Sequence, residues 1–518
     1  MVNHGISRAC LTCKTRRIKC DEGRPTCRKC LKSKRTCLGY KDDADTLFRG
    51  YNSSSVGDHW GGPNVPVRSS RPSKVLNSPT KQPSIGADTE DLSVWQMFFS
   101  DYVLASKDRS LSRGYFDGLE NLLNNTNPDS ELVQAAKIVA QASAASKYDS
   151  QDVLRMTRAK YSDILVAFQS VLNDPDKCNT DEALMTTALL GLYEMIVATE
   201  VYPSAHSIHV KGVSAILCTR DLPFELLAGS SLFQTFNTLL PQNPSPEAHI
   251  PGLLSAYCCS KADPSTKNLD AILIRLPPVR RRALKILSDP KASKIELRSL
   301  KQEAILLNKE FSLWPLCLPK EWMPQTLGEI QEGEVLLNDE ALDEMPFWPG
   351  RIDTYYDMYV VAVWDVYRKA RLKLLNVIVQ CSERLRGDSQ VHDKSNTLPK
   401  LQGEINELVD GLCASIPFHL VADLQSCLTA GSASSEPFTP GKALGGLLLM
   451  YPLHIASTLP MVPPKQKAWM QGRLRWIGTH MGIRQATMLA NSKLEVSHKF
   501  IADGHALVLA GSLIQPLG

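Results

Sequence analysis

Six of the fourteen cysteines lie in a short segment near the N-terminus, and their spacing repeats. The stretch CLTCKTRRIKC, residues 10–20, returns seventeen residues later as CRKCLKSKRTC, residues 27–37. The whole pattern is C-x2-C-x6-C-x6-C-x2-C-x6-C. A segment this short cannot fold on a hydrophobic core alone, so cross-links through the thiols must hold it together.

The thiols can be cross-linked in two ways, by disulfide bonds or by metal ions. The N-terminal residues show no basic region followed by an apolar run, so we expect no signal peptide and a reducing compartment. Pairs spaced C-x2-C in such a compartment usually bind metal. Two separate tetrahedral zinc sites would need more thiolates than the six present. A thiolate that bridges two zinc ions serves as a ligand of both, so two bridging thiolates make six cysteines sufficient. The pattern therefore predicts one cluster of two zinc ions and six cysteines.

Two other zinc folds share part of this spacing. Cys13 and Cys27 are separated by thirteen residues, as in the first finger of a nuclear receptor. A second finger should follow closely, but the next cysteine after Cys37 is Cys178. A RING domain needs a ligand histidine in this region, where only His4 is near. Neither alternative explains why the second half repeats the six-residue step of the first.

Positive charge is concentrated in the same segment. Residues 1–40 contain eleven Lys and Arg and two acids, a net charge of +9. The remaining residues contain 47 bases and 52 acids, a net charge of −5. A basic head on a mildly acidic body indicates a polyanionic partner for the head. The basic runs also suit nuclear import.

Residues 10–40, CLTCKTRRIKCDEGRPTCRKCLKSKRTCLGY, resemble the fungal zinc binuclear cluster (Zn2Cys6) family of transcription factors. All six cysteine spacings match the family pattern, as do the basic run after the second cysteine and the loop proline Pro25. The resemblance implies two zinc ions per chain. It assigns their ligands as follows: Cys10 and Cys27 bridge the ions, Cys13 and Cys20 complete one site, and Cys30 and Cys37 complete the other.

The resemblance also implies how the basic residues act. Family geometry makes residues 11–19 a short helix whose C-terminal end enters the DNA major groove, with a second helix after Cys27. Arg17 stands where the family usually has a base-reading lysine, and a guanidinium can donate two hydrogen bonds to guanine. A simpler reading is that cations near a helix C-terminus offset its dipole. The family implies CGG-like triplets in double-stranded DNA, contacted by these residues: Lys14, Arg16, Arg17 and Lys19.

Residues 41–90 change in composition, being rich in Ser, Gly, Pro and Asn without a helical or strand period. This composition predicts a disordered, flexible linker. Sustained apolar positions at heptad spacing are missing, so we expect no coiled coil here. A homodimer would therefore form through the body.

Residues 91–518 predict an all-α body of packed helices. Apolar stripes at helical spacing run through residues 132–143 and 154–171. Thr180 is placed to cap a helix that continues to about Val201, and an aromatic-rich helix is expected from about Arg351 to Arg386. The body resembles the fungal-specific transcription factor domain, a regulatory domain, in three stretches: LLGLYEM (189–195), HSIHVKGVSAIL (206–217) and WIGTHMGIRQATMLA (476–490).

Several features of the body have competing readings. The uncharged stretch 443–464 contains glycines and prolines, which favour a buried helix and loop over a membrane span. His206 and His209 share a helix face without an evident third ligand, so we expect structural histidines. The eight remaining cysteines are read as buried, and the run 280–282 as a solvated helix end. The acidic segment 321–350 is read as body surface rather than a segment that activates transcription.

Catalytic motifs of hydrolases, metalloproteases and nucleotide-binding enzymes are missing from the sequence, so we expect no enzyme. We predict a mainly α, nuclear, sequence-specific transcription factor for RNA polymerase II, which contacts DNA, zinc and coactivators. The alternative is a zinc protein that binds nucleic acid without sequence preference. The ratio of specific to random DNA affinity at fixed salt separates the two.

Overall fold

The structure is a computed structural model, and the chain divides into two compact units, Met1–Gln82 and Pro83–Gly518. Each unit is described by itself below. The structure describes residues 12–13, 16, 18–21, 27–33, 35, 87–108, 111–199, 205–219, 269, 271–273, 275–331, 345–386, 397–429, 438–492, 496 and 498–512.

In the described part of the N-terminal unit, the regular helix is α2 (Arg28–Lys32), where the second helix of the cluster was expected. Thr12 and Cys13 are also helical, but residues 18–20 have no regular secondary structure. The backbone N–H of Ile18 donates to the Cys13 carbonyl at 3.1 Å. The helix expected over residues 11–19 therefore ends before Ile18.

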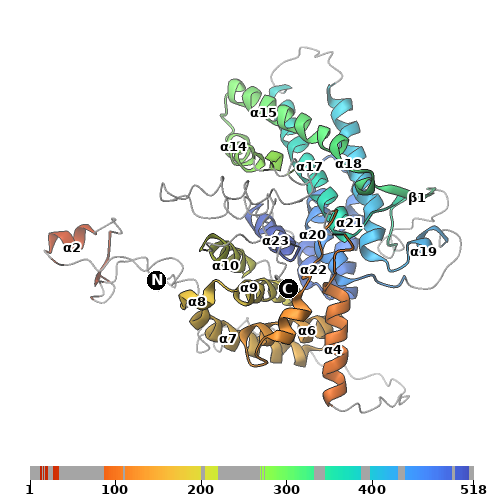
Figure 1. Cartoon of the computed structure of the whole chain (residues 1–518). Coiled ribbons are helices and arrows are strands. Elements are labelled where there is room, and N and C mark those ends of the chain that lie inside the picture. The colour runs from red at the N-terminus through yellow and green to blue at the C-terminus, as the bar shows by residue number, and fades with distance from the viewer. Residues whose placement is uncertain are drawn as a thin grey trace, which may run out of the picture. The chain divides into compact units, whose positions relative to one another are not determined.

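The N-terminal part of the body consists of helices, coloured orange to yellow in Figure 1. Helix α4 begins inside the last residues that the composition assigned to the linker. Helix α6 packs against both α7 and α9, and α9 packs against α10. Their bounds are α4 (Ala87–Tyr102), α5 (Leu119–Asn125), α6 (Glu131–Lys147), α7 (Gln151–Leu172), α8 (Pro175–Cys178), α9 (Asp181–Val197) and α10 (Ala205–Thr219).

The sequence signals for these helices are confirmed locally. Every position of the predicted stripe in α6 is buried. The predicted stripe in α7 has two half-buried members, Leu165 and Val171, and five buried ones: Leu154, Thr157, Tyr161, Ile164 and Phe168. The Thr180 hydroxyl accepts the N–H of Ala183 at 3.2 Å, so Thr180 caps α9 as predicted. Helix α9 ends at Val197, a turn earlier than expected.

The C-terminal part of the body is also mainly helical, coloured green to blue in Figure 1. Helix α15 packs against α17, and α14 packs against both. The helical bounds are α14 (Leu276–Ser288), α15 (Lys294–Leu313), η3 (Trp314–Cys317), η4 (Lys320–Trp322), α17 (Met358–Arg386), α18 (Thr397–Leu420), α19 (Leu424–Thr429), α20 (Ala443–Thr458), α21 (Pro464–His480), α22 (Arg484–Asn491) and α23 (His498–Ala510).

A two-stranded antiparallel sheet interrupts the helices, formed by β1 (Gln325–Ile330) and β2 (Gly350–Thr354). Gln325 pairs with Thr354 and Ile330 with Gly350, with a register shift between Thr326 and Gly328. The prediction of a helix from about Arg351 was therefore wrong at its start, because residues 351–354 belong to β2 and α17 begins at Met358.

This sheet also places the two ends of the acidic segment 321–350. Trp322, Ile330 and Phe347 are all buried, and the Trp322 indole donates to the Leu111 carbonyl at 2.9 Å. Residues 332–344 lie outside the described residues. Both described ends of the segment are therefore built into the body. This agrees with the expectation that the segment belongs to the body.

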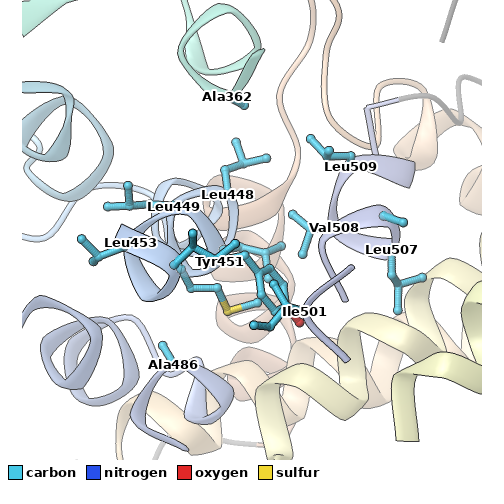
Figure 2. Packing of buried hydrophobic residues seen from close by; sticks show 14 of the residues in the cluster. Ala362, Leu448, Leu449, Tyr451, Leu453, Ala486, Ile501, Leu507, Val508 and Leu509 are labelled. Carbon is cyan, nitrogen blue, oxygen red and sulfur yellow. The ribbon is translucent and has the colours of Figure 1, made fainter. Parts of the chain in front are cut away.

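Helix α20 forms the centre of the core, and it comes from the uncharged stretch 443–464. It is buried on every face, and it packs against α4, α17, α18, α21, α22 and α23. Figure 2 shows Leu448 and Tyr451 of α20 beside Ile501 and Val508 of α23. A Cβ at Gly445 would lie 1.8 Å from the His419 carbonyl oxygen, so only glycine allows α18 to approach this closely. Among the described residues, no helix is both long and apolar enough to cross a bilayer.

The two histidines of α10 belong to this core. His206 Nε2 is 2.9 Å from the Phe500 carbonyl oxygen, and His209 Nε2 is 2.9 Å from the Tyr161 hydroxyl. Both imidazoles are buried. Their interpretation as structural histidines is confirmed.

Two expectations about the body need correction. The run 280–282 lies within α14 rather than at its end, and Arg280 is half-buried while Arg282 pairs with Glu303 at 2.6 Å. Cys381, Cys413 and Cys427 are buried as predicted, but Cys317 is exposed and Cys178 is half-buried. Both exceptions follow from helix ends, where fewer neighbours surround a side chain. The side chains of the other three lie outside the described residues: Cys218, Cys258 and Cys259.

Buried histidines predict that acid destabilises the body. Burial lowers the pKa of His209 to about 3 and that of His454 to about 4, against about 6.5 in the unfolded chain. Below about pH 6.5 the unfolded chain therefore binds protons that the folded chain does not. The stability that depends on these neutral histidines should be fully present above about pH 6.5. Below that pH, the free energy of unfolding should fall by up to about 1.4 kcal/mol per pH unit for each histidine toward pH 4.

Urea unfolding of the full chain at several pH values between about 7.5 and 5 measures this slope. The matched variant is His209→Gln, whose amide can keep a hydrogen bond to Tyr161. Its slope should be smaller by about one proton. An unchanged slope in this variant would exclude His209 as a source of the effect.

Candidate metal centre

Four cysteine side chains converge in the N-terminal unit. Cys27 precedes the first residue of α2, Cys30 lies in its first turn, and Cys13 lies in the helical turn of the first repeat. The Cys13 Sγ is 3.6 Å from the Cys27 Sγ and 3.9 Å from the Cys30 Sγ. These three thiols are buried, and Cys20 packs against them half-buried. The buried cluster of this unit thus consists of thiols rather than aliphatic side chains.

The geometry of the thiols fits a zinc site. The sulfur atoms of Cys13, Cys20 and Cys27 all lie within 4.8 Å of one another. A zinc–thiolate bond is about 2.3 Å, so two thiolates of one tetrahedron are about 3.8 Å apart. The sulfur atoms of Cys13 and Cys27, which the resemblance assigns to the same zinc, are 3.6 Å apart, close to that value. An all-thiolate donor set is also one that zinc prefers.

The structure brings together four of the six predicted ligands. The group of Cys13, Cys20 and Cys27 contains three of the four residues that the resemblance implied for one zinc. Cys10 and Cys37 lie outside the described residues. When bound, zinc supplies the cross-links that replace a hydrophobic core in a unit this small.

The N-terminus of α2 is held by side chains from both cysteine repeats. The Cys30 N–H donates to the Cys27 Sγ at 3.3 Å. The N–H groups of Arg28 and Lys29 donate to the two carboxylate oxygens of Asp21, at 3.1 and 3.3 Å. The first three N–H groups of the helix therefore all have acceptors, which is the requirement at a helix start.

Asp21 is the residue of this site that sequence reasoning missed. Desolvation opposes its ionisation, but the hydrogen bonds from Arg28 and Lys29 prevail and hold its pKa below the ordinary value. Asp21 directly follows Cys20, so its carboxylate joins the end of the first repeat to the helix of the second. The only sequence signal was an acid within a strongly basic segment.

The described cations of this unit are exposed. Arg16 and Lys19 lie between Cys13 and Cys20, and both side chains face solvent. Lys14 and Arg17 lie outside the described residues. The second repeat adds four more exposed cations: Arg28, Lys29, Lys32 and Arg35. Exposed cations on a scaffold fixed by thiols form a surface suited to a polyanion.

Comparisons with known proteins agree with this arrangement. The family model of the fungal Zn(2)-Cys(6) binuclear cluster domain matches residues 8–46. The transcription factor dbaG of Emericella nidulans is 34% identical over 423 residues, which cover 80% of this chain and 95% of that protein. An alignment of this length necessarily includes most of the helical body.

Two further relatives match over a length close to that of the cluster domain. White-opaque regulator 2 of Candida albicans is 67% identical over 33 residues, 6% of this chain and 7% of that protein. The transcriptional regulatory protein moc3 of Schizosaccharomyces pombe is 57% identical over 35 residues, 7% of each chain. No solved structure matches the chain.

Asp21 accepts two hydrogen bonds at the start of α2, and these should make zinc leave more slowly than it would from the thiols alone. In Asp21→Ala, two N–H groups at the start of α2 lose their acceptor while every cysteine remains. Zinc release to a chromogenic chelator should be faster by about tenfold, the usual effect of removing a group that orients metal ligands. Asp21→Asn keeps one acceptor oxygen, so its rate of zinc release should lie between those of the wild type and Asp21→Ala. Release at the wild-type rate from Asp21→Ala would contradict this role.

Proposed function

Because the chain belongs to the fungal Zn2Cys6 transcription factors, we propose that it regulates RNA polymerase II transcription in the nucleus by reading CGG-like triplets of double-stranded DNA. That it is a DNA-binding transcription regulator follows from the family. The observation that carries the finer proposal is the convergence of thiols on both sides of exposed cations in the first repeat.

We propose two zinc ions per chain, held by the six cysteines of residues 10–37. Cys27 is suited to bridge them, because its sulfur contacts a residue of each proposed site. Its Sγ is 3.6 Å from the Cys13 Sγ and accepts the N–H of Cys30. Cys10 is proposed as the second bridge, at the corresponding position of the first repeat.

The DNA contacts are proposed to come from the residues between Cys13 and Cys20. Arg17 would donate to guanine O6 and N7, and Lys19 would contact phosphate. The exposure of Arg16 and Lys19 supports this use of the segment. Lys14 and Arg16 are proposed to add contacts beside them. An arginine in place of the family's lysine keeps the donors but changes their reach, which should alter the preferred base.

The division of labour is proposed to follow the three segments of the chain. Residues 1–40 would bind DNA, residues 41–90 would act as a flexible tether, and residues 91–518 would form the regulatory body. The body is where we propose contacts with coactivators and with a second copy of the chain. The relative dbaG is matched over 95% of its length by an alignment that includes most of the helical body.

Specific reading of DNA is tested by removing the proposed reader and a proposed phosphate contact separately. Arg17→Ala should weaken binding to a CGG-containing duplex by about 1–3 kcal/mol and leave binding to random DNA nearly unchanged. Lys19→Ala should weaken binding to both duplexes alike and reduce the salt dependence by about one phosphate contact. Titrations at several salt concentrations measure both effects. Equal losses on both duplexes for Arg17→Ala would mean binding without sequence preference.

The two-zinc arrangement is tested by removing a proposed bridging thiolate. Cys10→Ala and Cys27→Ala should each lose both zinc ions and unfold the N-terminal unit, because metal binding supplies its folding energy. Zinc content of the purified full chain, measured by mass spectrometry, gives the result. Cys317→Ala is the control, since this thiol is exposed in the body. A folded Cys10→Ala unit that retains one zinc would be incompatible with bridging by Cys10.

A further inference from the structure

A cleft opens where several helices of the body end. Helices α6, α9 and α21 all end beside it, and α22 begins there with Arg484. Helix α22 packs against α9 and α21, and α21 also packs against α6, so the walls belong to one packed unit. The volume of the cleft is about 700 Å³, which lies within the range of small-molecule sites. The cleft therefore has the size of a site for a small organic ligand.

The lining of the cleft combines apolar and polar side chains. Met488 of α22 and Ala198 at the end of α9 supply apolar surface. Thr487 and Asn491 of α22 add a hydroxyl and an amide. A Cβ at Gly478 would lie 1.7 Å from the Thr487 Oγ1, so glycine lets α21 and α22 approach closely at this wall. Such a surface suits a ligand that has an apolar body and a few polar groups.

One cation of the lining is held in place by two hydrogen bonds. The Arg484 Nε donates to the Ser146 Oγ at 3.3 Å, and its Nη2 donates to the Asp149 Oδ1 at 3.0 Å. The remaining nitrogen, Nη1, donates to no residue that the structure describes. Lys147, the other cation of the lining, is already paired with Asp101. Arg484 is therefore the group that can bind an anionic part of a ligand.

The acid that pairs with Arg484 is much more exposed than the arginine itself. The Asp149 side chain is 80% exposed, whereas that of Arg484 is 23% exposed. In the Arg368–Asp365 pair of the same body, neither side chain is more than 6% exposed. Exposed ion pairs contribute little, because water screens the two charges. A carboxylate inside the cleft is shielded better from water, so it binds the guanidinium more strongly than Asp149 does.

Asp149 occupies a position where helices often end with glycine. Helix α6 closes with a hydrogen bond from the Ser150 N–H to the Ala145 carbonyl at 2.8 Å, and Asp149 between them has a φ of 51°. This left-handed conformation is unfavourable for a residue with a side chain. The carboxylate accepts from Arg484 and, at 2.6 Å, from the Gln151 amide. Asp149 thus holds the guanidinium in place, and it is exposed enough to release it.

We propose that this cleft binds a small carboxylic acid with an apolar body, whose carboxylate replaces Asp149 on the Arg484 guanidinium. The body of the ligand lies on Met488 and Ala198, and a hydroxyl of the ligand bonds to Asn491. A carboxylate fits better than a phosphate, because the nearby Asp149 repels a doubly charged group more strongly. The bound acid connects α9 with α22, so it stabilises the body by mass action.

Titration of the full chain with 3-phenyllactate, followed by NMR signals of the ligand, tests the proposal. This probe carries a carboxylate, a hydroxyl and an apolar ring. Its Kd should be on the order of 1 mM, as expected for a ligand of this size. The amide of the same acid lacks the charge and should bind about tenfold more weakly. No DNA is present, so the outcome does not depend on the proposed reading of CGG-like triplets.

Three variants and a control locate the binding. Arg484→Gln should weaken binding of 3-phenyllactate about tenfold, because the charged donor is lost. Asp149→Asn should instead tighten it about threefold, because the competing carboxylate is removed. Ala198→Phe should prevent binding by filling the cleft, although every charge remains. Arg282→Gln is the matched control, because Arg282 also pairs with an acid but lies outside the cleft, and it should bind like the wild type.

Four results would overturn the proposal. No binding by the wild type at a concentration about tenfold above the expected Kd would show that the cleft takes no acid of this kind. Equal binding of the acid and its amide would show that the guanidinium does not bind the carboxylate. An Arg484→Gln protein with the wild-type affinity would place the acid elsewhere on the chain. Weaker binding by Asp149→Asn would show that Asp149 supports the ligand rather than competing with it.

Discussion

The body depends on the burial of one helix that carries no charge. Helix α20 has six helical neighbours and no face left for solvent, so it must be apolar throughout rather than amphipathic. The glycine at position 445 lets α18 approach its backbone closely. The neighbouring helices turn their own apolar stripes toward α20, and their polar residues remain outside or form the buried network around Asp365.

The N-terminal unit also needs a buried centre, but it builds this centre from different side chains. Its buried side chains are thiols, and the start of its helix is satisfied by Cys27 and Asp21 instead of by a hydrophobic stripe. A scaffold fixed by thiols leaves its cations on the surface. The chain therefore uses two kinds of stabilisation: cysteines hold the small unit, which is proposed to contact DNA, and apolar helices build the large unit.

Signals within a few residues of the sequence predicted much of the fold. Contacts between residues far apart in the chain could not be predicted in this way. The stripe of α6 and the cap at Thr180 are each predicted from residues within a few turns, and both appear in the structure as expected. Four of the six cysteines of the repeat converge, and the other two lie outside the described residues. The pairing of Gln325 with Thr354 joins residues far apart in the chain, so the strand was mistaken for the start of α17. Asp21 acts through partners on another segment, Arg28 and Lys29, which no periodicity reveals.

The double use of Cys27 has a consequence for oxidative chemistry. Its sulfur lies among the thiols proposed to bind zinc, and it also caps α2 by accepting the Cys30 N–H. An oxidant that converts this thiolate to a sulfenic acid or a disulfide removes a ligand and the cap in the same event. Loss of the metal and loss of the helix are then coupled, so the unit responds to oxidation as a single cooperative element rather than by gradual loosening.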